Sequence, residues 1–221
     1  MRYIVGIDEV GRGSLAGPVV VAAVSIPQGL RINFSGCGKL RDSKKLTPQK
    51  REQWFKYIKS RPEVSFALAR VYPRRIEKLN ISKAANLAAF RAFCRLTTDY
   101  SLPTTNCLIY LDGGLYLGNQ GRGFSQIKTR INADRIRAHL RGHPRVSATT
   151  VVRGDEKIKA ITIASIIAKV HRDRLMTRLG KIYPKYGFEI HKGYGTKKHF
   201  AALKKHGRSK VHRRTFVSHI N

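Results

Sequence analysis

Acidic residues are scarce in this chain of 221 residues, which has 13 Asp and Glu against 44 Lys and Arg. The formal charge of +31 opposes compaction by self-repulsion. It is typical of proteins that bind a polyanion, because each neutralised phosphate releases condensed counterions. The excess of basic residues therefore predicts a nucleic-acid partner. It does not distinguish a protein that only binds nucleic acid from one that also cuts it.

Cysteines and long apolar segments are also few. Cys37, Cys94 and Cys107 have none of the spacings of zinc or redox motifs, and their odd number suits a reducing compartment. The longest apolar run, residues 18–26, is too short to span a bilayer, and it follows charged residues, unlike a signal peptide. The apolar content of 42% still allows a buried core. We expect a soluble, monomeric, cytoplasmic protein with no membrane partner.

The hydrophobic pattern predicts strands that alternate with helices. Strands are expected at residues 3–7, 19–26, 64–71, 107–111 and 146–152. Helices are expected from Pro48 to about Lys59, capped by Thr47, then after a cap at Ser82, at residues 132–140 and at residues 160–179. Residues 118–123 are expected to form a loop. This order predicts one α/β domain whose mixed β-sheet is flanked by helices.

The composition changes after about residue 180. Residues 191–221 contain nine Lys and Arg, five of the eight histidines and no acid. We expect a single domain, with residues 1–179 as the sheet core and residues 180–221 as a basic helical segment that covers a polyanion lying on the sheet. The histidines of this segment show no metal-ligand spacing, so packing or phosphate contact is expected of them.

Four of the few carboxylates follow predicted strands. Asp8 and Glu9 come after the first strand, Asp112 after residues 107–111, and Asp155 shortly after the last strand. Loops from a rigid sheet gather at such ends and form sites. Two carboxylates about 4 Å apart repel by about 4 kcal/mol at an effective dielectric of about 20. A cluster would therefore take up protons or hold divalent cations.

Oxygen ligands without a nearby Cys or His pair favour Mg²⁺ or Mn²⁺ over Zn²⁺. Two such ions can activate a water and stabilise the leaving oxygen in phosphodiester hydrolysis. The alternative is that the four acids are separate turn and cap residues, because Asp commonly follows strands.

Six blocks stand out along the chain: GIDEVGRGSLAGPVVVAAV (6–24), DSKKLT (42–47), LDG (111–113), GDEKIKAITIASIIAKVHRD (154–173), HKGYGTKKH (191–199) and HRRTF (212–216). In this order they resemble the type 2 ribonucleases H, the bacterial ribonuclease HII group. The resemblance extends over nearly the whole chain and implies a ribonuclease H-like fold. It places the family's acidic metal ligands on Asp8, Glu9, Asp112 and Asp155.

The resemblance also implies a reaction. It is endonucleolytic hydrolysis of the RNA strand of RNA–DNA hybrids, with cleavage 5′ of single ribonucleotides embedded in duplex DNA. The products would carry 3′-hydroxyl and 5′-phosphate ends, two Mg²⁺ or Mn²⁺ ions would act, and the activity would support ribonucleotide removal from DNA.

Other motifs predict contacts with substrate. Gly11, Arg12 and Gly13 leave backbone amides open to a ribose or phosphate, and the 2′-hydroxyl is what separates RNA from DNA. The resemblance implies that this segment reads that hydroxyl through its main chain; the alternative is an ordinary glycine turn. By resemblance, Tyr194 packs on the nucleotide 3′ to the ribose; alternatively, it anchors a turn.

Further substrate contacts are expected from basic and hydroxyl side chains. Phosphate contacts are expected of Ser43, Lys44, Lys45, Arg213 and Arg214. Ser165 and Lys169 lie four residues apart on a helix, so both can face the pocket, although Ser165 is also suited to a buried, internally bonded hydroxyl. Asp173 is either a fifth acid near the site or a partner for Arg172 or Arg174.

Two rival functions remain open. A non-catalytic basic nucleic-acid-binding protein explains the charge but not the spacing of the acids. A different nuclease or integrase on the same scaffold is disfavoured by the glycine-arginine-glycine and KGYGT blocks. The chain shows no C-terminal glutamine-plus-aromatic segment of the kind that docks on a sliding clamp, so no such partner is expected.

Overall fold

The computed structural model describes residues 1–34, 38, 40–41, 43–103, 106–117, 148–218 and 220. The predicted loop at residues 118–123 and the predicted helix at residues 132–140 lie outside the described residues, as does Cys37.

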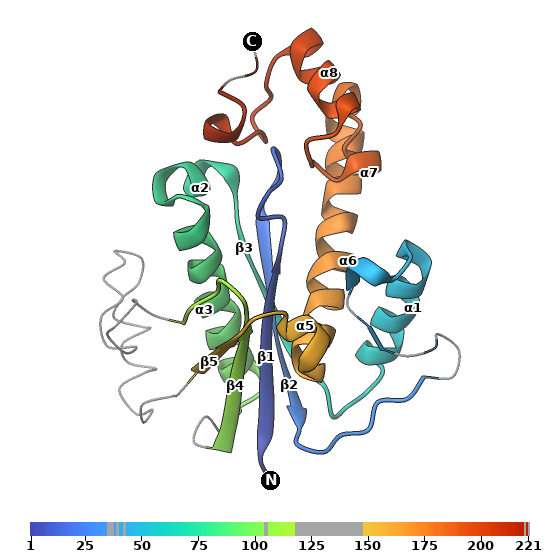
Figure 1. Ribbon diagram of the computed structural model, residues 1–221, viewed down its shortest axis with the longest axis vertical. Coiled ribbons are helices and arrows are strands. Elements are labelled where there is room, and N and C mark those ends of the chain that lie inside the picture. The colour runs from blue at the N-terminus through green and yellow to red at the C-terminus, as the bar shows by residue number, and fades with distance from the viewer. Residues whose placement is uncertain are drawn as a thin grey trace.

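A five-stranded sheet forms the centre of the molecule, in the order β3-β2-β1-β4-β5 (Figure 1). β1 (Tyr3–Val10) pairs antiparallel with β2 (Val19–Pro27), and β2 pairs antiparallel with β3 (Ser65–Val71). β4 (Cys107–Asp112) and β5 (Ala148–Val151) continue the sheet parallel to β1. The carboxyl ends of β1, β4 and β5 therefore meet at one edge of the sheet. The predicted mixed sheet is confirmed.

Helices cover both faces of the sheet (Figure 1). α2 (Pro73–Leu79) and α3 (Ile81–Asp99) pack on the face that carries Val21 and Ala23. α1 (Pro48–Lys59) and α6 (Lys159–Ile182) pack on the opposite face, which carries Ala22 and Val24. Successive β2 side chains point to opposite faces, so a strand between two helical layers is apolar throughout rather than alternating.

The second predicted helix begins differently from the prediction. α3 begins at Ile81, and its cap is Asn80, whose side chain accepts a hydrogen bond from the Lys83 amide at 3.0 Å. Ser82 therefore lies in the first turn and is not the cap. The short helix α2 was not predicted, because its seven residues carry too few apolar positions to show a helical period. The Thr47 cap of α1 is confirmed, since Thr47 Oγ1 accepts from the Lys50 amide.

Gly6 sets how closely α6 approaches the sheet. A Cβ at Gly6 would lie 2.2 Å from the carbonyl carbon of Ala160 and 2.3 Å from the amide nitrogen of Ile161. Only glycine therefore allows the first turn of α6 to cross directly over β1. This contact places α6, and the one-turn helix α5 (Gly154–Lys157) before it, beside the end of β1.

The C-terminal segment lies at one end of the molecule, around the end of α6, and has its own small core (Figure 1). It includes α7 (Phe188–His191) and α8 (Lys197–His206). Its apolar side chains pack with the loop after β1 and the end of α6, in a cluster of Leu15, Ala16, Leu175, Met176, Tyr186, Phe188, Leu203 and Val217. The expected boundary at residue 179 falls inside α6. No helix in the described part of the chain is long and apolar enough to cross a membrane.

Candidate active site

Asp8 and Glu9 lie within β1 rather than after it. The strand runs three residues beyond the prediction, to Val10, and pairs Asp8 with Ala22 and Glu9 with Val21 of β2. The ladder continues because β2 supplies a partner backbone along this whole length, whatever the side chains are. Asp8 is 5% exposed, and its Oδ1 accepts a hydrogen bond from the Glu9 amide at 2.7 Å.

Asp112 is the last residue of β4 and lies beside the end of β1. The two strands are parallel, with Ile7 opposite Leu111. The Gly154 amide of α5 donates to Asp112 Oδ1 at 2.8 Å. Carboxylate oxygens of Asp8, Glu9 and Asp112 all lie within 4.8 Å of one another. The predicted convergence at the strand ends is confirmed for these three residues.

Asp155 lies close to this group but is not part of it. It is the second residue of α5, is 5% exposed, and is near enough for its charge to raise the pKa of Asp8. Its Oδ2 lies 3.5 Å from Nζ of Lys44, which is exposed. Thr162 Oγ1 donates to the carbonyl oxygen of Asp155 at 2.7 Å, which fixes α5 against α6.

The cluster is electrostatically costly without a cation. Burial raises the pKa of Asp8 well above its ordinary value, and the charges of Glu9, Asp112 and Asp155 raise it further. A hydrogen bond from the Glu9 amide lowers the pKa but does not offset these effects. Burial also raises the pKa of Glu9, although Arg12 opposes this rise. Asp8 and Glu9 therefore ionise less readily than in water, because water is excluded and like charges lie nearby.

The free ligand atom of the cluster is Glu9 Oε2. This oxygen is buried and has no hydrogen-bond partner in the described part of the chain. Buried polar atoms are nearly always bonded, so an orphaned carboxylate oxygen beside two other acids points to an ion. The oxygen-only donor set of Asp8, Glu9 and Asp112 fits Mg²⁺ or Mn²⁺.

The side chain of Arg12 holds the other oxygen of Glu9. Its Nη1 donates to Glu9 Oε1 at 3.1 Å. Its Nη2 donates to Ser82 Oγ at 3.2 Å and to the Gly114 carbonyl at 3.3 Å. Arg12 thus ties the loop after β1 to α3 and to the turn after β4, and it orients Glu9 towards the cluster.

Gly11 and Gly13 lie in different surroundings. Gly11 has φ +88°, and a Cβ there would lie 2.1 Å from Nε of Arg172. A Cβ on Gly13 would meet nothing within 4 Å, so this position is open to an approaching molecule. Gly11 is required by the fold, whereas nothing in the packing requires Gly13.

Arg213 does not lie at the surface, and the prediction that it contacts phosphate is wrong. It is 0% exposed, and its guanidinium donates to the carbonyls of Gly11, Arg12 and Gly17. The C-terminal segment folds back onto the loop after β1 at this point and buries Arg213 there. The composition of the segment gives no sign of this contact. Arg214 is exposed, and its amide donates to Glu77 Oε1 at 2.7 Å.

The predicted contacts of the DSKKLT block divide into buried and exposed residues. The hydroxyls of Ser43 and Ser165 lie 2.6 Å apart and are buried, with 4% and 5% exposure. Ser165 therefore has the buried, internally bonded hydroxyl, and Ser43 faces the interior, contrary to the prediction. Lys44 and Lys45 are exposed, and Lys45 Nζ lies 2.6 Å from Glu156 Oε1.

Tyr194 is half-buried and lies over α6. The centre of its ring is 5.7 Å from Lys169 Nζ and 5.3 Å from the guanidinium carbon of Arg172. It lines a cavity of about 800 Å³ that also has residues of α1, α6 and α7 in its wall. The turn formed by Lys192 to Tyr194 therefore presents the ring to an open space rather than burying it.

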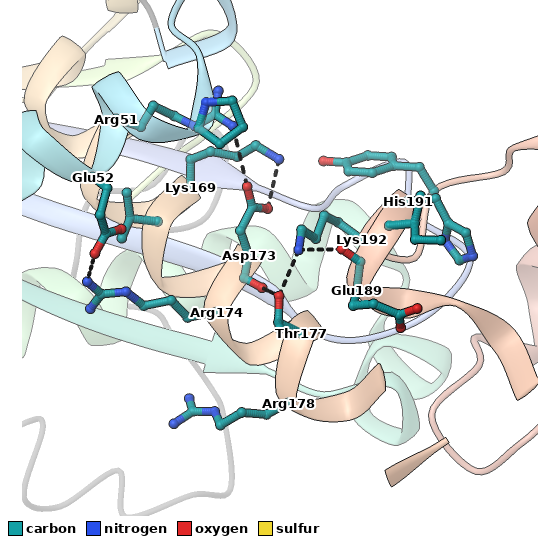
Figure 2. A pocket seen from close by; sticks show the side chains of 14 residues that line it. Arg51, Glu52, Lys169, Asp173, Arg174, Thr177, Arg178, Glu189, His191 and Lys192 are labelled. Carbon is teal, nitrogen blue, oxygen red and sulfur yellow. Dashed lines mark hydrogen bonds and ion pairs between the residues drawn. The ribbon is translucent and has the colours of Figure 1, made fainter. Parts of the chain in front are cut away.

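Asp173 lies in the wall of this cavity with different partners from those expected. Figure 2 shows Asp173 between Lys169 and Arg51. Its carboxylate oxygens lie 2.8 Å from Nζ of Lys169 and 3.6 Å from Nη2 of Arg51. Arg174 turns to Glu52 instead. Asp173 is therefore not a fifth acid of the cluster, and one of its partners comes from α1, which no local pattern indicates.

Comparison with known proteins agrees with this arrangement. The sequence matches the family model described as Ribonuclease HII over residues 5–219. It is 39% identical over 216 residues to the protein named Ribonuclease HII of Chlorobium phaeobacteroides, across 98% of this chain and 90% of that protein.

Two solved structures are also similar. One is the crystal structure of the ribonuclease H2 from Pyrococcus horikoshii OT3, with a TM-score of 0.68, 24% identity, and coverage of 99% of this chain and 96% of that chain. The other is Bst-RNase HIII in complex with Mn²⁺, with a TM-score of 0.66, 18% identity, and coverage of 97% and 64%. Since the family model covers almost all of a chain with this acidic cluster, the protein belongs to the ribonuclease HII family and is a metal-dependent endoribonuclease.

Proposed function

We propose that the protein hydrolyses the RNA strand of RNA–DNA hybrids and cuts 5′ of single ribonucleotides embedded in duplex DNA. The products carry 3′-hydroxyl and 5′-phosphate ends, so the activity supports ribonucleotide removal. The supporting observation is the meeting of Asp8, Glu9 and Asp112 within 4.8 Å, in a chain whose net charge of +31 suits a polyanion.

In this proposal Asp8, Glu9, Asp112 and Asp155 hold two Mg²⁺ or Mn²⁺ ions. When bound, such ions activate water and stabilise charge on the leaving oxygen. Glu9 contributes its unpartnered Oε2 while Arg12 fixes Oε1. Without the metal ions, Lys44 neutralises the charge of Asp155. When the ions are bound, the exposed ammonium of Lys44 can turn to a substrate phosphate.

The substrate crosses the acidic cluster over the open side of the loop after β1, whose other side packs on the C-terminal segment. Gly11 to Gly13 approach the ribose through their main chain, which the open space at Gly13 supports. Tyr194 contacts the nucleotide on the 3′ side. Phosphate contacts come from Lys44, Lys45, Lys169 and Arg214. Residues 1–179 act as the catalytic core, and residues 180–221 act as a substrate-binding segment of the same domain.

A duplex with one ribonucleotide tests this function directly. We expect a single nick 5′ of the ribonucleotide in Mg²⁺ or Mn²⁺, none in EDTA, and none in the matched all-DNA duplex. Tight binding without a nick would favour the non-catalytic binder. Nicking of the all-DNA duplex would favour a nuclease of different specificity.

A further inference from the structure

The loop between β1 and β2 is held from inside by two buried arginines. Arg213, from the C-terminal segment, donates from Nη1 to the Arg12 carbonyl at 2.7 Å and from Nη2 to the Gly11 carbonyl at 2.6 Å. Its Nε donates to the Gly17 carbonyl at 3.1 Å. The same loop is thereby held at both of its ends by a residue about 200 positions further along the chain.

Arg172 of α6 holds the second half of this loop. Its Nη2 donates to Ser14 Oγ at 2.7 Å and to the Ala16 carbonyl at 3.2 Å, and its Nε donates to the Pro18 carbonyl at 3.1 Å. Ser14 Oγ in turn donates to the Gly11 carbonyl at 2.9 Å. Arg172 Nη1 reaches the Lys192 carbonyl at 2.9 Å, so the turn that carries Tyr194 is held by the same guanidinium.

Neither guanidinium has a carboxylate within ion-pair distance in the described part of the chain. Both side chains are 0% exposed, and burial lowers the pKa of each, that of Arg213 to about 9. A buried charge without a counter-ion is tolerated only when hydrogen bonds satisfy it. The carbonyls of the loop must therefore point inwards.

The direction of these carbonyls fixes the direction of two amides. In a planar trans peptide the C=O and the next N–H point in opposite directions. With the carbonyls of Gly11 and Arg12 held inwards, the amides of Arg12 and Gly13 point away from Arg213. No described residue accepts a hydrogen bond from either amide. By contrast, the Leu15 and Gly17 amides donate to carbonyls of the C-terminal segment.

We propose that Arg213 and Arg172 are positioning residues for ribose selection, because they hold the amides of Arg12 and Gly13 as paired outward donors for the 2′-hydroxyl oxygen. The inference rests on the proposed function and adds to it. The C-terminal segment then contributes selectivity for the sugar through Arg213, besides its positive charge.

Conservative lysine variants test this role. Arg213→Lys and Arg172→Lys keep the charge but replace a fork of donors with a single ammonium. Arg95→Lys is the matched control, because exposed Arg95 on α3 also donates to a carbonyl, that of Leu68 at 2.7 Å, away from the site. Binding is measured in EDTA, where no cleavage occurs, to a duplex with one ribonucleotide and to its all-DNA counterpart. Thermal unfolding reports whether each variant is folded.

We expect Arg213→Lys and Arg172→Lys to lower the preference for the ribonucleotide duplex by about fivefold for each hydrogen bond lost from it. Affinity for the all-DNA duplex should change by less, and Arg95→Lys should alter neither value. An equal loss on both duplexes, or an unchanged preference in folded variants, would overturn the proposal.

Hydrogen exchange tests the same inference without substrate or variant. In the wild-type protein the amides of Arg12 and Gly13 should exchange much faster than those of Leu15 and Gly17. Equal protection of the four amides would overturn the positioning role even if the enzyme cuts as proposed. Conversely, the four amides could exchange as expected in a protein that shows no preference for the ribonucleotide duplex. That result would refute the proposed function, and with it the role of the two amides in ribose selection.

Discussion

Arg12 binds one oxygen of Glu9, at 3.1 Å, and the other oxygen is buried with no hydrogen-bond partner among the described residues. A carboxylate held in this way has one oxygen fixed and one free for a metal ion. The guanidinium also stabilises the charged form, since it lowers the pKa that burial raises. The side chain of Arg12 therefore supports the carboxylate that we propose as a metal ligand, and it does not itself face the substrate in this proposal.

Replacing Arg12 with alanine should weaken Mn²⁺ binding by about tenfold or more, as for other residues that orient a ligand. Two causes act together, because Glu9 loses its orientation and its pKa rises further. Calorimetric titration of the metal checks this. Metal affinity equal to that of the wild type would show that Glu9 holds its position without Arg12.

Asp8→Asn and Asp112→Asn should abolish cleavage and leave hybrid binding largely intact, because the basic surface is unchanged. In the metal-free protein, Asp8→Asn should also raise the melting temperature at neutral pH. Because the pKa of Asp8 is raised in the folded state, the unfolded chain releases this proton first, and stability falls as pH rises above the ordinary aspartate pKa of about 3.9. Scanning calorimetry with and without Mn²⁺ measures both effects. Mn²⁺ should stabilise the wild type by more than it stabilises the variant. Residual cleavage by either variant would contradict the assigned roles.

Alanine at Gly11 and at Gly13 should have different effects. Gly11→Ala should destabilise the fold, because φ is +88° and its Cβ would lie 2.1 Å from Nε of Arg172. Gly13→Ala adds a methyl group in open space, so the melting temperature should stay within a few degrees of the wild type while KM for the ribonucleotide duplex rises. Thermal unfolding and steady-state cleavage separate the two cases. An equal loss of stability in both variants would contradict this difference.

Three buried histidines lie together in the C-terminal segment, where His191 stacks on His199 and His199 is hydrogen-bonded to His212. His199 Nδ1 donates to the Tyr194 carbonyl, which leaves its Nε2 to accept from Nε2 of His212 at 3.1 Å. His212 Nδ1 accepts from the Ser209 amide. His191 donates to the Tyr186 carbonyl through Nε2 and accepts from the Gly193 amide through Nδ1. The tautomer of each ring is thus determined by its partners.

This network predicts loss of stability in mild acid. Burial lowers the pKa of His199 and of His212 to about 4. The unfolded chain, with ordinary histidine pKa values of about 6.5, therefore binds more protons than the folded chain between these limits. Stability should fall as pH decreases through this window, by up to about 1.4 kcal/mol per pH unit for each histidine. Denaturant unfolding measures the slope.

Glutamine variants isolate the contribution of the network. His199→Gln removes one titrating ring, so the slope in this window should become shallower. His206→Gln serves as the matched control, because His206 is exposed and should leave the slope unchanged. A slope that is the same in all three proteins would assign the acid sensitivity to other groups.

The order of strands and helices follows from local pattern. The apolar runs of β1 and β2, the Thr47 cap and the length of α6 are set by residues close together in the chain. The pattern also indicated that Asp8 and Asp112 would meet, because parallel strands in one sheet carry their ends to one edge. It placed the end of β1 too early, since the strand's length depends on pairing with β2 rather than on its own polar residues.

Burial of charge was decided by tertiary structure alone. Arg213 and Arg214 are adjacent and chemically identical, yet one is enclosed by the loop after β1 and the other is exposed. The partners of Asp173 likewise come from its own helix and from α1. The sequence by itself determined the main strands and helices and placed acids near the carboxyl ends of the strands. Only the packing of distant segments determined which charged groups lose water, because burial depends on contacts between residues that no short window of sequence contains.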